Sequence, residues 1–272
     1  MNYRHAFHAG NFADLLKHAL LIEAVAALTR DSRPLSIIDT HAGAGIYDLG
    51  DVPATRTGEA AAGIERLLAE AGAPDVFSGL VKAVTDLRRQ GGRLYPGSPV
   101  LISRGLRKTD HYVACELRPD DHALLRQALA KTPNAEAVRA DGYQTAAARV
   151  QAGEATLVVI DPPFERPDDY QRIVETARAV LKRNAAASLF IWLPIKDLDT
   201  LDRFETNLAS VGAPGFVAQT RMRPLDDPLK MNGCAIAALN PPVGLAAKAQ
   251  VAADWIARVL GEKGALGRVD PL

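Results

Sequence analysis

The chain has 272 residues, of which 48% are hydrophobic and 24% are charged, as is usual for folded globular proteins. This length accommodates one large α/β domain with a sizeable core, and the composition excludes a disordered or fibrous protein. The 32 basic and 32 acidic residues cancel, so charge alone does not indicate a nucleic-acid partner, which would have to bind a local basic patch.

Residues 1–10 lack a basic segment followed by an apolar one, and no apolar run reaches the roughly 18 residues that a membrane span requires. We therefore expect a cytoplasmic protein that does not contact a membrane. Cys115 and Cys234 each lie within an apolar run, where a thiol usually acts as a small buried hydrophobic group, so we expect no disulfide.

The first predicted element is a helix that Asn11 caps and that continues to about Thr29. Apolar runs rich in β-branched residues follow, mostly separated by stretches with helical periodicity: Leu35–Ala42, His111–Leu117, Ala135–Ala140, Thr156–Ile160, Ser188–Leu193, Gly215–Thr220 and Gly233–Leu239. This alternation predicts an α/β fold with a mostly parallel sheet and helices on both faces. Only a Pro-rich, charged loop joins the last two runs, so we expect the last strand to be antiparallel.

Residues 51–95 interrupt this alternation, because they have helical periodicity and contain no convincing strand. We expect them to form a small helical subdomain, inserted after the first strand of a single domain that spans residues 1–272.

A rigid turn follows the apolar run at residues 156–160. Asp161 comes at the carboxyl end of this predicted strand, where open α/β sheets bind their ligands. Pro162 and Pro163 remove two backbone donors and restrict the dihedral angles, so the carbonyl groups of Asp161 and Pro162 stay available. An amino group could donate one hydrogen to the Asp161 carboxylate and one to the Pro162 carbonyl, while the ring of Phe164 stacks on its base.

This turn suits methyl transfer to the exocyclic amine of a nucleobase, whose lone pair is delocalised into the ring and is a poor nucleophile. Accepting both amine hydrogens localises the lone pair toward the incoming methyl group. We therefore assign Asp161 as hydrogen-bond acceptor and candidate proton acceptor, Pro162 as orienting group and Phe164 as stacking ring. The alternative is a proline-stiffened turn whose Asp caps a helix.

A glycine-containing turn follows the first predicted strand. The sequence Thr40-His41-Ala42-Gly43-Ala44-Gly45 lets a ligand approach the backbone closely, so Gly43 is a candidate cofactor contact. The turn departs from the Gly-x-Gly-x-x-Gly pattern of dinucleotide sites, which disfavours a nicotinamide oxidoreductase. A nucleoside without phosphates, such as S-adenosylmethionine, fits better.

Polar residues follow other predicted strands. Glu116 occupies the position where an acid accepts ribose hydroxyls in nucleoside-binding α/β folds, and the inserted segment explains its distance from the glycine turn. Asp141, before Gly142, could accept the adenine amine of the cofactor. Ser98 is expected to cap a helix whose exposed amides could hold the cofactor's carboxylate. The alternatives are a helix cap or solvated charge for each acid, and capping alone for Ser98.

The first residues combine aromatic and basic side chains. Tyr3 and His5 could stack on bases and Arg4 could contact a phosphate; the alternative is a packed N-terminal arm. The candidate metal ligands are His5, His8, His18 and His41. No cysteine or paired acid completes a familiar metal-ligand spacing with them, so we expect no metal.

Basic residues occur in several other places. Lys17 lies at the edge of the apolar stripe of the first helix, so we expect it to point toward a pocket or toward solvent. Arg104-Arg107-Lys108 and Arg221-Arg223-Lys230 are most simply solvated surface clusters. The second cluster lies in the predicted hairpin loop and is the better candidate for phosphate contact.

Taken together, these segments resemble the RlmJ-type adenine-N(6) methyltransferases of 23S ribosomal RNA. The matching segments are Tyr3-Arg4-His5-Ala6-Phe7-His8-Ala9-Gly10-Asn11, Asp14-Leu15-Leu16-Lys17-His18, Asp39-Thr40-His41-Ala42-Gly43-Ala44-Gly45, Arg56-Thr57-Gly58-Glu59, Tyr95-Pro96-Gly97-Ser98-Pro99, Asp141-Gly142, Asp161-Pro162-Pro163-Phe164 and Asn240-Pro241-Pro242. Agreement in this order along the chain is more specific than any single motif. Two departures are Phe164, where Tyr is common in the family, and Phe12, where His is common.

The resemblance implies a Rossmann-like, S-adenosylmethionine-dependent methyltransferase sheet with a helical subdomain after the first strand. It also implies that Asp161 is catalytic, that Lys17 lies near the active site and that Tyr3 touches the RNA. The implied cofactor contacts are His18, His41, Ser98, Glu116, Asp141, Gly142 and Asp161.

We therefore expect methyl transfer from S-adenosylmethionine to the amino nitrogen of a specific adenine in 23S ribosomal RNA. We expect a monomer that acts on naked RNA or on an early assembly intermediate. Two alternatives stay open: a DNA adenine-N(6) methyltransferase, which shares the tetrapeptide at residues 161–164, and a catalytically idle Rossmann-fold module that binds RNA.

Overall fold

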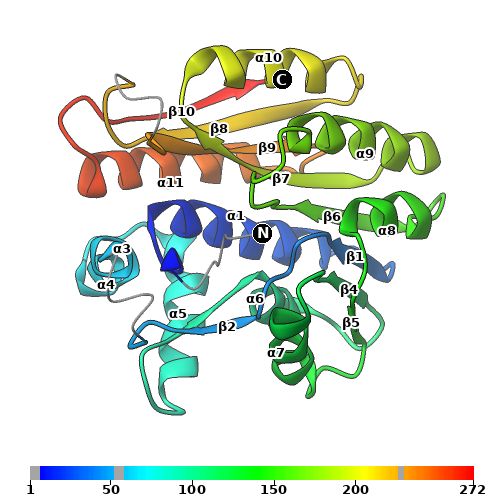
Figure 1. The fold of residues 1–272 in the computed structure, drawn as a ribbon, viewed down its shortest axis with the longest axis horizontal. Helices are drawn as coiled ribbons and strands as arrows, with labels where there is room; N and C mark the ends of the chain where they lie inside the picture. Colours follow the sequence, from blue (N-terminus) through cyan, green and yellow to red (C-terminus); the bar gives the residue numbers. More distant parts are fainter. Residues whose placement is uncertain (1–6, 52–57, 226–229) are drawn as a thin grey trace.

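An eight-stranded sheet runs through the centre of the molecule in the order β10-β8-β9-β7-β6-β1-β4-β5 (Figure 1). The computed structural model describes residues 7–51, 58–225 and 230–272. The strands of this sheet are β1 (Leu35–Asp39), β4 (His111–Cys115), β5 (Ala135–Val138), β6 (Ala155–Ile160), β7 (Ser188–Ile195), β8 (Gly215–Arg221), β9 (Gly233–Leu239) and β10 (Leu266–Pro271). The pairs from β5 through β4, β1 and β6 to β7 are parallel, which confirms the predicted fold class.

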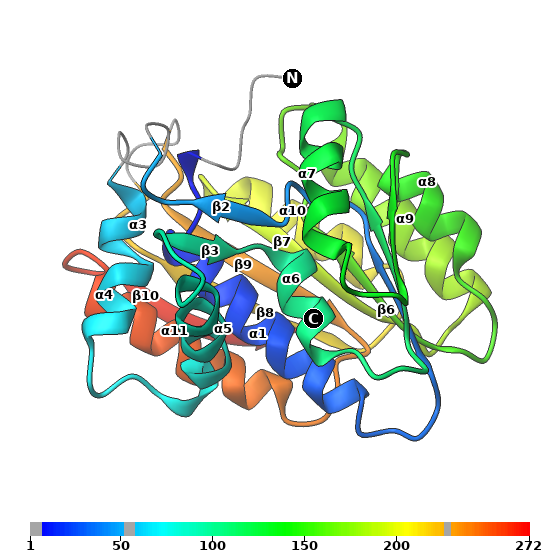
Figure 2. The ribbon, with the colours of Figure 1, turned by 90° about the horizontal axis from the view of Figure 1, so that it is seen from below.

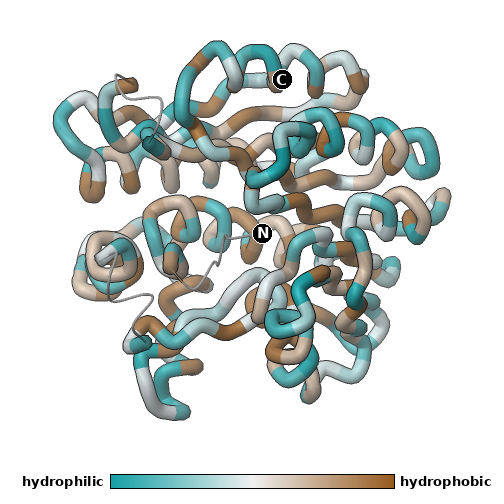
Figure 3. Tube along the Cα trace, viewed as in Figure 1, coloured by the Kyte–Doolittle hydropathy of each residue, from teal (hydrophilic) through white to brown (hydrophobic). Residues whose placement is uncertain are grey.

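Apolar residues build one core on each face of the sheet, because successive strand residues point to opposite sides. In β1, Ile37 belongs to one core and Ile38 to the other. The first face is covered by helices that include α1 (Phe12–Leu28), α6 (Ser98–Gly105), α7 (Pro119–Leu129) and α11 (Leu245–Leu260). The second face is covered by α8 (Gly142–Arg149), α9 (Asp169–Arg183) and α10 (Leu198–Ala209). Figure 3 shows hydrophobic strands inside and hydrophilic outer surfaces on the helices.

Between β1 and β4, the chain forms short helical segments and a second, two-stranded sheet. The helical segments are α3 (Glu59–Ala62), α4 (Ile64–Ala69), the 3-10 helix η2 (Asp75–Phe77) and α5 (Ser78–Arg88), and α5 packs against α1 (Figure 2). β2 (Ile46–Asp48) pairs antiparallel with β3 (Leu94–Pro96). β3 overlaps only the last two of residues 51–95, where no strand was expected, and β2 precedes them. Three residues are too few for strand alternation to be visible in the sequence. That this segment is a distinct subdomain stays a prediction.

The C-terminal part of the sheet is antiparallel. β9 pairs antiparallel with both β8 and β7, which confirms the predicted hairpin. β10 was not predicted; it extends the sheet beyond β8 as an antiparallel edge strand. All its residues are partly or fully exposed, and Pro271 is tolerated because an edge strand need not donate every backbone hydrogen bond.

The strand order reverses at the centre of the sheet. From β1 the chain continues to β4 and β5 on one side, and it then returns to β6 and β7 on the other side. Ligands of open α/β folds bind beyond the carboxyl ends of the strands at such a reversal. Asp39 ends β1, Glu116 follows β4 and Asp161 follows β6, so three acids lie at this place.

Candidate active site

A cavity of about 930 Å³ lies at these carboxyl ends, within the ~300–1,000 Å³ that is typical of small-molecule sites. The structure brings all the predicted catalytic and cofactor residues to its wall: Lys17, His18, His41, Gly43, Ser98, Glu116, Asp141, Gly142, Asp161, Pro162 and Phe164. Tyr3, Arg4 and His5, which we expect to contact RNA, lie outside the described residues.

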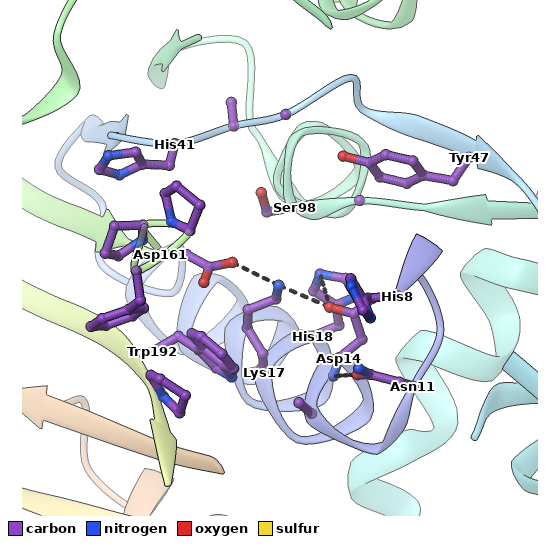
Figure 4. A pocket seen from close by; sticks show the side chains of 18 of the residues that line it. His8, Asn11, Asp14, Lys17, His18, His41, Tyr47, Ser98, Asp161 and Trp192 are labelled. Carbon is purple, nitrogen blue, oxygen red and sulfur yellow. Dashed lines mark hydrogen bonds and ion pairs between the residues drawn. The ribbon is translucent and has the colours of Figure 1, made fainter. Parts of the chain in front are cut away.

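Lys17 of α1 lies between two carboxylates at one end of the cavity (Figure 4). Its Nζ donates to Asp161 Oδ2 at 2.7 Å and lies 2.8 Å from Asp14 Oδ1. Burial alone would lower the pKa of Lys17, but the two carboxylates outweigh burial and hold it well above its ordinary value. Of the two orientations expected for Lys17, the structure has the one toward the pocket.

The cap of α1 positions this lysine. Asn11 Oδ1 accepts the backbone hydrogen of Asp14 at 3.0 Å, as predicted for a helix cap. Asp14 Oδ2 in turn accepts the backbone hydrogen of Gly10 at 2.9 Å, so both oxygens of this buried carboxylate have partners. Lys17 follows Asp14 by three residues, which places both side chains on one face of the helix.

The turn after β6 is held in an unusual conformation. Phe164 has a φ of 49°, in the left-handed region that a bulky side chain rarely adopts. Its ring packs against Tyr170, with ring centroids 4.8 Å apart, and against Trp192 of β7 at 5.8 Å. Trp192 also lines the cavity, but the sequence analysis missed it because a tryptophan inside an apolar strand gives no signal of its own.

Glu116 forms the opposite wall together with the glycine turn. Its carboxylate accepts the backbone hydrogens of Gly43 at 3.1 Å and of Arg118 at 2.7 Å, and burial raises its pKa. Gly43 has a φ of 66°, and a Cβ there would lie 2.3 Å from the hydroxyl of Tyr47. A side chain at this position is therefore excluded by both backbone conformation and space.

Asp141 is both a helix cap and a cavity residue. Its Oδ1 accepts the backbone hydrogen of Gln144 at 3.2 Å, and its Oδ2 accepts Arg172 Nη2 at 2.6 Å. Gly142 packs so closely on the residue after β1 that a Cβ would lie 1.9 Å from the carbonyl oxygen of Thr40. The start of α8 is thereby fixed against the turn that follows β1.

Ser98 differs from the prediction, because it is the first residue of α6 and Gly97 occupies the cap position without a side-chain bond. The Ser98 hydroxyl instead donates to Asp39 Oδ2 at 2.7 Å. Asp39 also accepts the hydroxyl of Tyr112 and the backbone hydrogen of His41. Burial raises the pKa of Asp39 to about 6. Sequence reasoning gave Asp39 no role, although its place at a strand end was a usable signal.

Among the histidines that line the cavity, His18 is buried and His41 is partly exposed. Burial lowers the pKa of His41 to about 4, and its ring contacts the edge of Tyr143 at 4.8 Å between centroids. His18 Nδ1 lies 2.8 Å from the hydroxyl of Tyr95. His41 is therefore uncharged at neutral pH and can offer a hydrogen bond without repelling a cationic cofactor.

The two basic clusters differ in their surroundings. Arg104 pairs with Asp86 and Arg107 with Asp110, so these charges are used within the protein. Arg223 pairs with Glu262 and lies at the cavity wall, as does Lys230. In the described part of the chain, no group of three or more His, Cys, Asp or Glu side chains could hold a metal ion, and no helix is long and apolar enough to cross a membrane.

The sheet order and the cavity at its reversal define a Rossmann-like α/β fold with a ligand site at the strand ends. Residues 32–270 match the family model described as "Ribosomal RNA large subunit methyltransferase D, RlmJ". The chain belongs to this family of large-subunit ribosomal RNA methyltransferases.

Two relatives agree with this family assignment, and a solved structure shares the fold. The chain is 33% identical over 259 residues to "Ribosomal RNA large subunit methyltransferase J" of Escherichia coli K12, covering 94% of this chain and 92% of the relative. A protein of the same name from Haemophilus influenzae is 31% identical over 268 residues, covering 97% and 95%. The fold is similar to the crystal structure of a protein from Legionella pneumophila, with a TM-score of 0.89, 24% identity and coverage of 97% and 98%.

Proposed function

We propose that the protein transfers a methyl group from S-adenosylmethionine to the exocyclic amino nitrogen of a specific adenine in 23S ribosomal RNA. The products are N(6)-methyladenine and S-adenosylhomocysteine. One observation carries the proposal: Asp161 lies at the rigid strand end in the same cavity as the predicted cofactor residues, beside Pro162 and Phe164. The printed names of two relatives, which describe large-subunit ribosomal RNA methyltransferases, support the choice of RNA.

The cofactor would occupy the wall formed by the ends of β1, β4 and β5. Glu116 would accept the ribose hydroxyls, Asp141 the adenine amine, and the α6 end near Ser98 the carboxylate group of the methionine part. Neutral His41 and buried His18 would bound the same wall. The sulfonium supplies the activated methyl group, so the reaction needs no metal.

The acceptor amine would face Asp161. Lys17 binds Oδ2, which leaves Oδ1 and the Pro162 carbonyl to accept the two amine hydrogens. The nitrogen lone pair then forms the new bond to the methyl carbon, while the electrons of the sulfur–carbon bond stay on sulfur and give a neutral thioether. The nitrogen finally loses one proton, for which Asp161 is the nearest acceptor in this arrangement.

Lys17 would act as a positioning residue for Asp161. The three side chains Asp14, Lys17 and Asp161 carry one net negative charge beside the place where the sulfonium binds. A preorganised carboxylate of this kind stabilises charge that develops on the amine nitrogen. Asp14 also compensates the cost of a buried ammonium close to a cationic cofactor.

The adenine would have to leave its stacked position to reach this cavity. Phe164 would stack on the base, and Arg223 and Lys230 at the cavity wall would contact phosphate groups. We further propose that Tyr3, Arg4 and His5 hold the RNA strand next to the flipped base.

Incubation with cofactor labelled in its methyl group tests this function. The substrates are 23S ribosomal RNA from a strain that lacks this activity, stripped of proteins, and as controls 16S ribosomal RNA and duplex DNA with many adenines. We expect label only in 23S RNA, and labelling on the order of 10²–10³-fold slower with the variant Asp161→Ala. Label in duplex DNA alone would identify a DNA methyltransferase, and no label despite measurable cofactor binding would reject the proposal.

A further inference from the structure

Arg172 of α9 reaches across to Asp141 at the start of α8, and both side chains line the cavity. Arg172 Nη2 lies 2.6 Å from Asp141 Oδ2, and only 20% and 23% of the two side chains are exposed. Partial exclusion of water makes such a charged hydrogen bond stronger than one on the open surface. Arg172 was not predicted as a site residue, since a basic residue near the start of an amphipathic helix gives no signal of its own.

The planar face of the Arg172 guanidinium group also packs on an aromatic ring. Its carbon lies 4.4 Å from the centre of the Tyr143 ring, a cation–π distance. The Tyr143 hydroxyl donates to buried Asp169 at 3.2 Å, which ties this ring to the first turn of α9. A lysine could make the bond to Asp141 or lie over the ring, but a planar guanidinium does both at once.

Asp141 keeps capacity for a further hydrogen bond. Its two oxygens accept one hydrogen each, from Arg172 and from the Gln144 backbone, and each carboxylate oxygen can accept two. Burial would raise the pKa of Asp141, but Arg172 and the Gln144 amide lower it below its ordinary value. The carboxylate is therefore oriented and ionised before any ligand arrives.

We infer that Arg172 is a positioning residue that holds the Asp141 carboxylate toward the purine amine of the cofactor and makes the site selective for that amine. The inference rests on the proposed placement of the cofactor's adenine beside Asp141. A cofactor base with a carbonyl oxygen in place of the amine would bring one acceptor against another. A site built around a fixed polar partner rejects such an analogue more strongly than a flexible site does.

Calorimetry with two ligands tests this inference: S-adenosylhomocysteine and its inosine analogue, in which oxygen replaces the purine amine. The proteins are wild type, Arg172→Gln, Arg172→Lys and Asp141→Asn. The matched control is Arg178→Gln, because Arg178 lies on the same helix, is exposed and bonds Ser210 away from the cavity. Thermal unfolding of each variant shows that it is folded.

We expect wild type to prefer the adenine ligand by at least about tenfold, the effect of one hydrogen bond to a charged group. Arg172→Gln should lose most of this preference, Arg172→Lys should keep part of it, and Arg178→Gln should keep all of it. In turnover assays, Arg172→Gln should raise KM for S-adenosylmethionine with kcat and the KM for RNA unchanged.

Three results would overturn the inference in distinguishable ways. If Asp141→Asn loses the preference and Arg172→Gln keeps it, Asp141 contacts the amine but Arg172 does not orient it. If Asp141→Asn keeps the preference, the adenine does not lie beside Asp141, and this part of the proposed cofactor site fails as well. Equal weakening of both ligands by Arg172→Gln would assign Arg172 a general structural role and also reject the inference.

Discussion

The two walls of the cavity are organised by different kinds of interaction. At the Asp161 wall, a lysine from the first helix bonds a carboxylate 144 positions later in the chain. At the Glu116 wall, the carboxylate accepts backbone hydrogens from the neighbouring turn and from the residues that follow it. The first wall thus depends on an ion pair between side chains of distant segments, and the second on hydrogen bonds from backbone groups, one of them 73 positions away.

This difference suggests that the two walls of the cavity have different roles. An acid held by a buried ammonium is suited to stabilising charge that appears during a reaction. An acid held by backbone amides is suited to binding a ligand that is present before and after the reaction. Substitutions at the Asp161 wall should therefore lower kcat, whereas those at the Glu116 wall should raise KM.

The largest effect is expected for Asp161→Ala. Removal of a positioned group that stabilises transition-state charge costs on the order of 10²–10³ in rate. We expect kcat to fall by this factor, while KM for S-adenosylmethionine rises by about tenfold at most, the equivalent of one hydrogen bond. Steady-state kinetics on 23S RNA measures both. A rise in KM with unchanged kcat would contradict the division between the walls.

Lys17→Met should reduce both activity and stability. Asp14 and Asp161 would lose a shared cation, and breaking a buried ion pair costs about 3–5 kcal/mol in the free energy of unfolding. We expect a loss near the lower end, measured by urea unfolding, together with a lower kcat.

Lys82→Met is the matched control for this substitution. Lys82 pairs with Asp86 on the surface and is 72% exposed, so its loss should cost less than about 1 kcal/mol and leave kcat unchanged. Equal losses of stability in the two variants would show that the buried pair has no special energetic role.

Glu116→Gln should act on binding alone. It replaces the charged acceptor proposed for the ribose hydroxyls, so KM for S-adenosylmethionine should rise by about 10-fold to 100-fold with kcat nearly unchanged. Glu136→Gln is the control, because Glu136 is exposed and pairs with Arg149 outside the cavity. A large fall in kcat for Glu116→Gln would contradict the expectation that the Glu116 wall acts on binding.

The smallest effect is a pH dependence that belongs to Asp39. Its pKa is raised from 3.8 to about 6, so the folded protein binds a proton more tightly than the unfolded chain. Its contribution to stability is full below pH 3.8 and is lost as the pH rises through about 6. Relative to Asp39→Asn, wild type should gain about 2–3 kcal/mol in unfolding free energy between pH 8 and pH 4. A difference that does not change with pH would show that Asp39 is not destabilised by burial.

Long apolar runs predicted most of the main sheet, because a buried strand needs such a run whatever its neighbours are. β2 and β3 have three residues each, and β10 is an exposed edge strand, so none of them carries this signal. The order of the strands depends on contacts between distant segments and was not predicted.

The site was predictable where function requires a residue type at a strand end, as for Asp161, Glu116 and Asp141. The ion pair of Lys17 was not, since nothing local connects α1 to the turn after β6. The hydroxyl of Ser98 was assigned to capping because its actual partner, Asp39, precedes it by 59 positions. Sequence patterns therefore identified the acids of the site but not the groups that hold them.

Identification of the methylated nucleoside tests the central claim most directly. Unmodified 23S ribosomal RNA is incubated with the protein and S-adenosylmethionine, digested to nucleosides and analysed by mass spectrometry against synthetic standards. The arrangement around Asp161 predicts N(6)-methyladenosine as the product, at a single adenine when the intact RNA is mapped. A methyl group on a ring carbon, a ribose hydroxyl or another base would contradict the account.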